Sequence, residues 1–137
     1  MVVLDSCAAF AMVNHTKEGD AISSLLLDGE ETIAPTLYVS EMAHTVAKYV
    51  RAGRINEDDA QRYLAACIGY IDRFDDDKNL ASEALAESFR RKHSSYDMFY
   101  LVLARRTGAA LFTLDKKMQA FAREMHVNCI EEASLAD

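Results

Sequence analysis

Four acidic side chains stand at places in the sequence from which they could act together: Asp5, Glu41, Asp97 and Asp115. Asp5 directly follows an apolar run at residues 2–4 that has the composition of a buried strand. Asp115 directly follows a second such run, at residues 109–114. Clustered carboxylates repel one another, so they need raised pKa values or a cation. Because Mg²⁺ prefers oxygen ligands and retains waters and phosphate oxygens, these acids predict metal-dependent chemistry at a phosphate.

The other two acids belong to predicted helices that adjoin predicted strands. Residues 32–35 indicate a further short strand, and Glu41 is expected in the first turn of the helix after it. Asp97 opens a nearly all-apolar helix that leads into the strand at 109–114. In open parallel sheets, ligands bind beyond the carboxyl ends of the strands. We therefore expect all four carboxylates to project toward that edge of the sheet.

Each acid also has an ordinary structural interpretation. Asp5 and Asp115 follow strands, which is where the N-cap of a following helix stands. Asp97 lies three residues after Ser94, at the spacing of a capping box. Glu41 could be a plain exposed helical acid. No single residue distinguishes a helix cap from a metal-binding site. The hypothesis of a site therefore depends on the predicted position of all four acids at the same edge of the sheet.

The sequence alternates strands and helices, which is typical of a parallel sheet covered by helices on both faces. We predict a three-layer α/β/α sandwich with a mainly parallel sheet of four or five strands, in a single domain over residues 1–137, since neither a linker nor a repeat interrupts the pattern. The expected strands lie at 2–4, 32–35, 109–114 and 127–130, the helices near 22–26 (closed by Asp28-Gly29), 39–50, 56–71, 80–92, 98–104 and 116–125, and a solvated loop at 75–77.

Composition places the chain among ordinary globular proteins. Half of its 137 residues are hydrophobic, enough for a full core. The run at 98–104, which no other uninterrupted apolar run exceeds, is far below the roughly 18 residues that suggest a membrane span. The three cysteines, Cys7, Cys67 and Cys129, have no zinc-binding spacing and suit a reducing compartment. We expect a soluble, cytoplasmic protein without a secretory leader or a membrane partner.

The net charge of −7 argues against a nucleic-acid partner, but the charge is unevenly distributed. Acidic residues outnumber basic ones over residues 16–83, whereas basic residues outnumber acidic ones over 84–126. Two of the acids in the basic half are Asp97 and Asp115. A basic rim around an acidic pocket is compatible with phosphate binding, and a scatter of solvated helix charges is the open alternative.

Four segments, in their order along the chain, resemble the PIN-domain ribonucleases. They are VVLDS, the segment from Pro35 to Glu41, SSYDMFYLVLARRTGA and LFTLDKKM. The resemblance spans nearly the whole chain, and the short length resembles the toxin of VapBC-type toxin–antitoxin pairs. It implies endonucleolytic hydrolysis of RNA that depends on one or two Mg²⁺ or Mn²⁺ ions and leaves a 5′-phosphate and a 3′-hydroxyl. It also implies a homodimer and a small cognate antitoxin that inserts a basic side chain near the acids.

The resemblance also implies residue roles. Asp5, Glu41, Asp97 and Asp115 correspond to the family's acidic, metal-binding quartet, and Ser6 and Thr113 to hydroxyl residues that orient ligands or water. The family has a strand near residues 73–80, where this chain has an acidic stretch, so a strand there stays in doubt. The basic residues that we expect to meet phosphates are Lys48, Arg51, Arg90 and Lys117.

Three further side chains lie near the predicted acids. We expect His44 to be a surface histidine, although substrate contact is the alternative. For Tyr96 and Tyr100, which flank Asp97, core packing is favoured over base stacking.

Two rival functions remain. A phosphoaccepting α/β domain also places an Asp after its first strand, but the phosphatase pattern needs a second Asp where Cys7 stands, and the receiver pattern needs a pair of acids near the start. A catalytically silent binding module of the same fold usually lacks one of the acids, and here all four are present.

Overall fold

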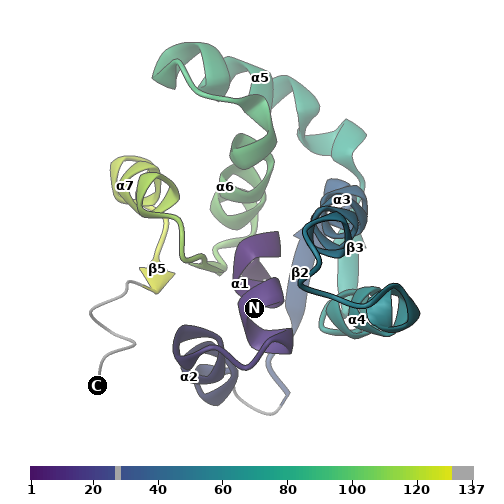
Figure 1. The fold of residues 1–137 in the computed structure, drawn as a ribbon. Coiled ribbons are helices and arrows are strands. Elements are labelled where there is room, and N and C mark those ends of the chain that lie inside the picture. The colour runs from purple at the N-terminus through teal and green to yellow at the C-terminus, as the bar shows by residue number, and fades with distance from the viewer. Residues whose placement is uncertain (27–28, 131–137) are drawn as a thin grey trace.

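The computed structural model describes residues 1–26 and 29–130, which form one parallel sheet between two groups of helices (Figure 1). The strands lie in the order β3-β2-β1-β4-β5, and every neighbouring pair is parallel. This confirms the predicted three-layer α/β/α fold, with five strands in the sheet. The strands are β1 (Val2–Leu4), β2 (Thr32–Pro35), β3 (Arg73–Asp75), β4 (Ala110–Phe112) and β5 (Cys129–Ile130).

The helices pack as two groups. One group, α1 to α4, is held together by contacts among its own members, chiefly α1 with α2 and α3 with α4. In the other group, α6 lies on β1, β2 and β4 and carries α5 and α7 (Figure 1). The bounds are α1 (Ser6–Val13), α2 (Lys17–Leu25), α3 (Leu37–Arg51), α4 (Glu57–Gly69), α5 (Asp77–Arg91), α6 (Ser95–Thr107) and α7 (Lys116–Glu124).

The centre of the core lies where α6 crosses β1. Every residue of β1 is buried, as expected for a strand with helices on both faces. In α6, Met98 and the run from Tyr100 to Ala104 are buried, which explains why this helix is apolar on nearly all sides. Even so, no helix in the described ranges is both long enough and apolar enough to cross a membrane.

The acidic stretch at 75–77 is not a solvated loop, so that prediction was wrong. Asp75 ends β3, Asp76 caps α5 by accepting from the backbone N–H of Lys78, and Asp77 is the first residue of α5. The Asp77 carboxylate also accepts from the backbone N–H of Leu37 at 3.0 Å. The strand that the family resemblance implies is therefore present, and its acids serve as caps and loop contacts.

Three features of the first half differ from what the sequence predicted. The helix α1 was not predicted, because its sequence SCAAFAMV is apolar on nearly every side and shows no amphipathic stripe. Helix α3 begins at Leu37, so Glu41 stands in its second turn rather than its first. Its buried side chains are those of Leu37, Tyr38, Met42 and Val46, whereas Val39, expected in the buried stripe, is exposed. Helix α2 ends at Leu25, and the predicted stop at Asp28 lies outside the described residues.

Candidate active site

Asp5 lies at the carboxyl end of the central strand β1 and is the N-cap of α1. Its Oδ1 accepts a hydrogen bond from the backbone N–H of Ala8 at 2.8 Å, and its Oδ2 accepts one from the hydroxyl of Thr113. The side chain is only 5% exposed. The capping interpretation of Asp5 is therefore correct, and it is compatible with a site because each carboxylate oxygen has a second lone pair.

The electrostatics of Asp5 indicate that other acids are near. Burial is the main reason why its pKa is raised to about 7, and the hydrogen bonds from Thr113 and Ala8 oppose that rise. The negative charges of Glu41 and Asp97 raise the pKa further. The charged side chains that shift this pKa most are acids, so the buried carboxylate lies in a negatively charged environment.

Glu41 is held by a chain of hydroxyl groups. The buried phenol of Tyr100 donates to its Oε1 at 2.6 Å, and Tyr100 is in turn hydrogen-bonded by the side chain of Ser6. Burial raises the pKa of Glu41, with smaller contributions in the same direction from Asp97 and Asp77. Tyr100 is in the core, as predicted, but its hydroxyl has a polar role that the sequence did not indicate.

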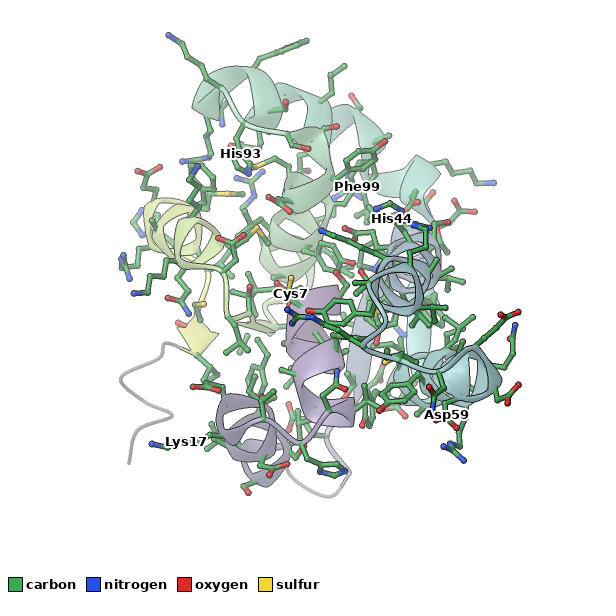
Figure 2. The ribbon with its side chains drawn as sticks, in the orientation of Figure 1. Cys7, Lys17, His44, Asp59, His93 and Phe99 are labelled. Carbon is green, nitrogen blue, oxygen red and sulfur yellow. The ribbon has the colours of Figure 1, made fainter. Side chains whose placement is uncertain are left out.

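Asp97 is paired with a histidine that the sequence analysis did not single out. His93 Nε2 lies 2.6 Å from Asp97 Oδ2, and the His93 ring packs edge-on against Phe121 with 5.0 Å between ring centroids. Ser88 Oγ donates to the His93 carbonyl and so helps to hold the turn between α5 and α6. Figure 2 shows His93 between α6 and α7. The four-residue spacing of His93 and Asp97 is a signal of such a pair in a helix, but His93 precedes the N-cap Ser94, so the spacing does not lie within one helix.

Asp115 is the N-cap of α7, directly beyond β4. Its Oδ1 accepts from the backbone N–H groups of Lys117 at 2.8 Å and Met118 at 3.3 Å. The backbone N–H of Asp115 donates to Thr113 Oγ1 at 3.1 Å. Thr113 thus joins the two acids that follow the central strands, since its hydroxyl donates to Asp5 and accepts from Asp115.

The pKa of the Cys7 thiol is affected by the charges of all four acids. The residue is exposed at the surface, but partial burial of its thiol raises the pKa to about 12, and the negative charges of Asp5, Asp115, Glu41 and Asp97 each raise it further. Figure 2 places Cys7 at the end of α1 that faces α6. The charges of all four acids therefore act at the start of α1, next to the carboxyl end of β1, and the raised pKa makes Cys7 a poor nucleophile.

The donor set suits a hydrated divalent ion better than a bare one. Among residues 1–26 and 29–130, no three His, Cys, Asp or Glu side chains lie close enough together to hold a metal ion by themselves. Mg²⁺, however, is commonly bound through one or two carboxylates while it keeps several waters and contacts substrate phosphates. The buried carboxylate of Asp5, on which the negative charges of Glu41 and Asp97 act, fits such an ion.

The basic rim inferred from the sequence is largely neutralised in the structure, and that inference needs correction. Buried Glu87 on α5 forms ion pairs with Arg90, Arg91 and Arg105, while Glu83 pairs with Arg105 and Arg106. Arg91 also pairs with Glu124. The pairs of Glu87 with Arg90 and Arg91 lie within α5, whereas those that involve Arg105, Arg106 and Glu124 join α5 to α6 and α7 and are not visible in a count of charges along the sequence.

Thr113→Val is expected to lower stability and to disturb the site, because the near-isosteric change leaves Asp5 Oδ2 and the Asp115 N–H without their shared partner. A buried polar group without a partner costs about 1–3 kcal/mol. Urea unfolding should show a loss in that range, and Thr113→Ser should recover most of it. Equal stability of the valine and serine variants would contradict this role.

Comparisons with known proteins agree with this architecture. A family model described as "PIN domain" matches residues 2–124. The solved structure of PAE2754 from Pyrobaculum aerophilum superimposes with a TM-score of 0.74 at 23% identity, covering 98% of this chain and 92% of that chain. VapBC2 from Rickettsia felis, solved bound to a DNA fragment from their promoter, superimposes with a TM-score of 0.67 at 15% identity, covering 96% of this chain and 98% of that chain. Among curated protein sequences, none matches significantly.

Proposed function

Because the chain belongs to the PIN-domain family, we propose that it is an endoribonuclease that depends on Mg²⁺ or Mn²⁺ and hydrolyses RNA phosphodiester bonds. The observation that supports the proposal is that Asp5 and Asp115, which follow the neighbouring strands β1 and β4, share the Thr113 hydroxyl, while the charges of Glu41 and Asp97 also act on Asp5. Membership of this family argues against the phosphatase and receiver alternatives.

The four acids are the groups that would hold the ion, directly or through its waters. When bound, a divalent ion supplies an activated water and stabilises negative charge on the departing oxygen. The protein contributes an arrangement of carboxylates that is already oriented. Hydrogen bonds from Thr113, Tyr100 and the first turn of α7 hold three of the acids, and His93 holds the fourth. Such outer contacts keep ligands from reorganising during the reaction.

Basic side chains near the acids would attract the RNA backbone. Lys48 and Arg51 lie on the same face of α3 as Glu41, and Lys117 follows Asp115 in the first turn of α7. Arg90 is already paired with Glu87, so a phosphate would compete with that carboxylate. Contacts of this kind set affinity and its dependence on salt.

We further propose that residues 1–137 act as one nuclease domain in the cytoplasm, as a homodimer and as the toxin of a toxin–antitoxin pair. The similarity to the chain solved in VapBC2 supports this assignment. The negative charges around Asp5 would attract a basic side chain from a small antitoxin, which would occupy the place of the metal ion.

The direct test is cleavage of single-stranded RNA by the purified protein. We expect cutting with Mg²⁺ or Mn²⁺, complete loss with EDTA, and recovery when Mn²⁺ is added in excess. The products should carry 5′-phosphates, which a 5′-phosphate-dependent exonuclease detects. Cutting that persists in EDTA, or that leaves 5′-hydroxyl ends, would contradict the proposed chemistry.

A further inference from the structure

A hollow of about 420 Å³ lies between α3 and the first turn of α6, beside the proposed catalytic acids. Glu41 lines this hollow as well as the acid cluster, so the two are continuous. All but one of its lining residues come from α3, at the spacing of a single helix face. The lining residues are Leu37, Ser40, Glu41, His44, Thr45 and Tyr96.

Tyr96 lies at the edge of this hollow and is 65% exposed, so the prediction that it packs in the core was wrong. Tyr96 lies in the first turn of α6, which begins at Ser95, and it is not among the buried residues of that helix. Tyr100, about one turn later, is buried. An exposed aromatic ring beside a catalytic acid is the type of surface on which unstacked nucleobases stack.

The remaining lining residues provide the other chemistry that a base requires. Leu37 gives an apolar contact, while Ser40, Thr45 and His44 carry groups that can donate or accept hydrogen bonds. Figure 2 shows His44 on α3. The volume is at the lower end of the range of ligand pockets, about 300–1,000 Å³, and suits one nucleotide rather than a protein segment.

The same face of α3 becomes basic beyond the hollow. Lys48 and Arg51 follow His44 by about one and two helical turns, and neither has an ion-pair partner within the described part of the chain. Lys48 also lines a second hollow of about 260 Å³ with Tyr49, Ala52 and Arg54. Along one face of α3, Glu41 is therefore followed by a hollow large enough for a nucleobase and then by Lys48 and Arg51. This order suits an RNA chain that runs along the helix away from the reaction centre.

We propose that this hollow is a nucleobase subsite, in which one unpaired base of single-stranded RNA stacks on Tyr96 next to the cleaved bond. The subsite makes the enzyme selective for unpaired RNA and for the base at that position, because a base within a duplex has no free face to stack. The inference rests on the proposed function.

The chain has no tryptophan, so Tyr96→Trp places a single fluorescent reporter at the hollow. With EDTA present to prevent cleavage, a short single-stranded RNA should quench this fluorescence in a saturable manner. An oligomer of the same length with abasic positions should not. A matched control is Tyr63→Trp, at a hollow of about 290 Å³ that Tyr63 shares with Val13 at the far end of α1. Equal quenching in the control, or equal quenching by the abasic oligomer, would overturn the subsite.

Kinetics separate the failure of the subsite from the failure of the proposed function. Tyr96→Ala should raise KM for single-stranded RNA roughly ten-fold, with a smaller change in kcat, and Tyr96→Phe should restore wild-type KM. If the wild type cuts RNA but Tyr96→Ala keeps wild-type KM on every sequence, the subsite is wrong and the nuclease stands. If the wild type cuts no RNA, the proposed function fails. If a peptide but not RNA quenched the fluorescence of Tyr96→Trp, the hollow would be a protein-binding site and the proposed nucleobase subsite would be wrong.

Discussion

Asp97→Asn is expected to abolish RNA cleavage, with a loss of roughly a hundred-fold or more, while the fold stays intact. The substitution keeps the shape of the side chain and its ability to hydrogen-bond His93. It removes the negative charge that would help to hold the divalent ion next to Asp5. Cleavage of a labelled single-stranded RNA and the circular dichroism spectrum should be measured on the same preparation.

The matched control is Asp59→Asn on α4, the same chemical change at an acid that pairs with Arg62 on the surface. That variant should cut RNA at the wild-type rate. Since the two variants pass through the same purification, they also control for a host ribonuclease. Full activity in folded Asp97→Asn protein would assign the cutting to a contaminant or to another site.

Asp5→Asn is expected to make the metal-free protein more stable at neutral pH. In the folded chain the pKa of Asp5 is raised to about 7 from an ordinary value of 3.8, chiefly by burial. The folded state therefore holds the proton more tightly than the unfolded state. Stability of the wild type falls as the pH rises from about 4 to about 7, and levels off above that. Each pKa unit corresponds to about 1.4 kcal/mol, so the gain at pH 8 should be on the order of a few kcal/mol.

Urea unfolding at pH 4 and pH 8, with EDTA and with Mg²⁺, tests this expectation. At pH 4 the variant and the wild type should be nearly equal, because Asp5 is then protonated in the folded state. At pH 8 saturating Mg²⁺ should stabilise the wild type more than the variant, by about 2.7 kcal/mol at a hundred times Kd. If Asp5→Asn raised the free energy of unfolding equally at both pH values, or if Mg²⁺ did not change the stability of the wild type, Asp5 would not belong to a cluster of repelling acids that binds a metal ion.

The parts of the fold that the sequence predicted correctly are those with a strong local pattern. β1, β2 and β4 were recognised because short continuous apolar runs are typical of strands buried on both faces. β3 was left in doubt because it is a partly exposed edge strand of only three residues, RFD, within an acidic stretch. α1 was missed because it is apolar nearly all round and has no amphipathic stripe.

Side-chain partners were much harder to predict than elements. The Tyr100 hydroxyl on Glu41 and the pair of Glu87 with Arg105 depend on how α6 is placed against α3 and α5. The exposure of Tyr96 is likewise known only once α6 is packed. The Asp97–His93 pair and the pairs of Glu87 with Arg90 and Arg91 have local spacings of three or four residues, but such spacings alone do not show that a pair forms.

The sequence by itself determined the order of the main strands and helices and the acids that follow them. It could do so because burial on both faces requires apolar runs, and because parallel strands bring their carboxyl ends to one edge. Only the tertiary structure decided that Thr113 joins Asp5 to Asp115, that Arg105 and Arg106 of α6 are neutralised by acids of α5, and that a hollow opens beside Glu41. These features arise from contacts between residues far apart in the chain, whose distances are set only when the helices pack against the sheet.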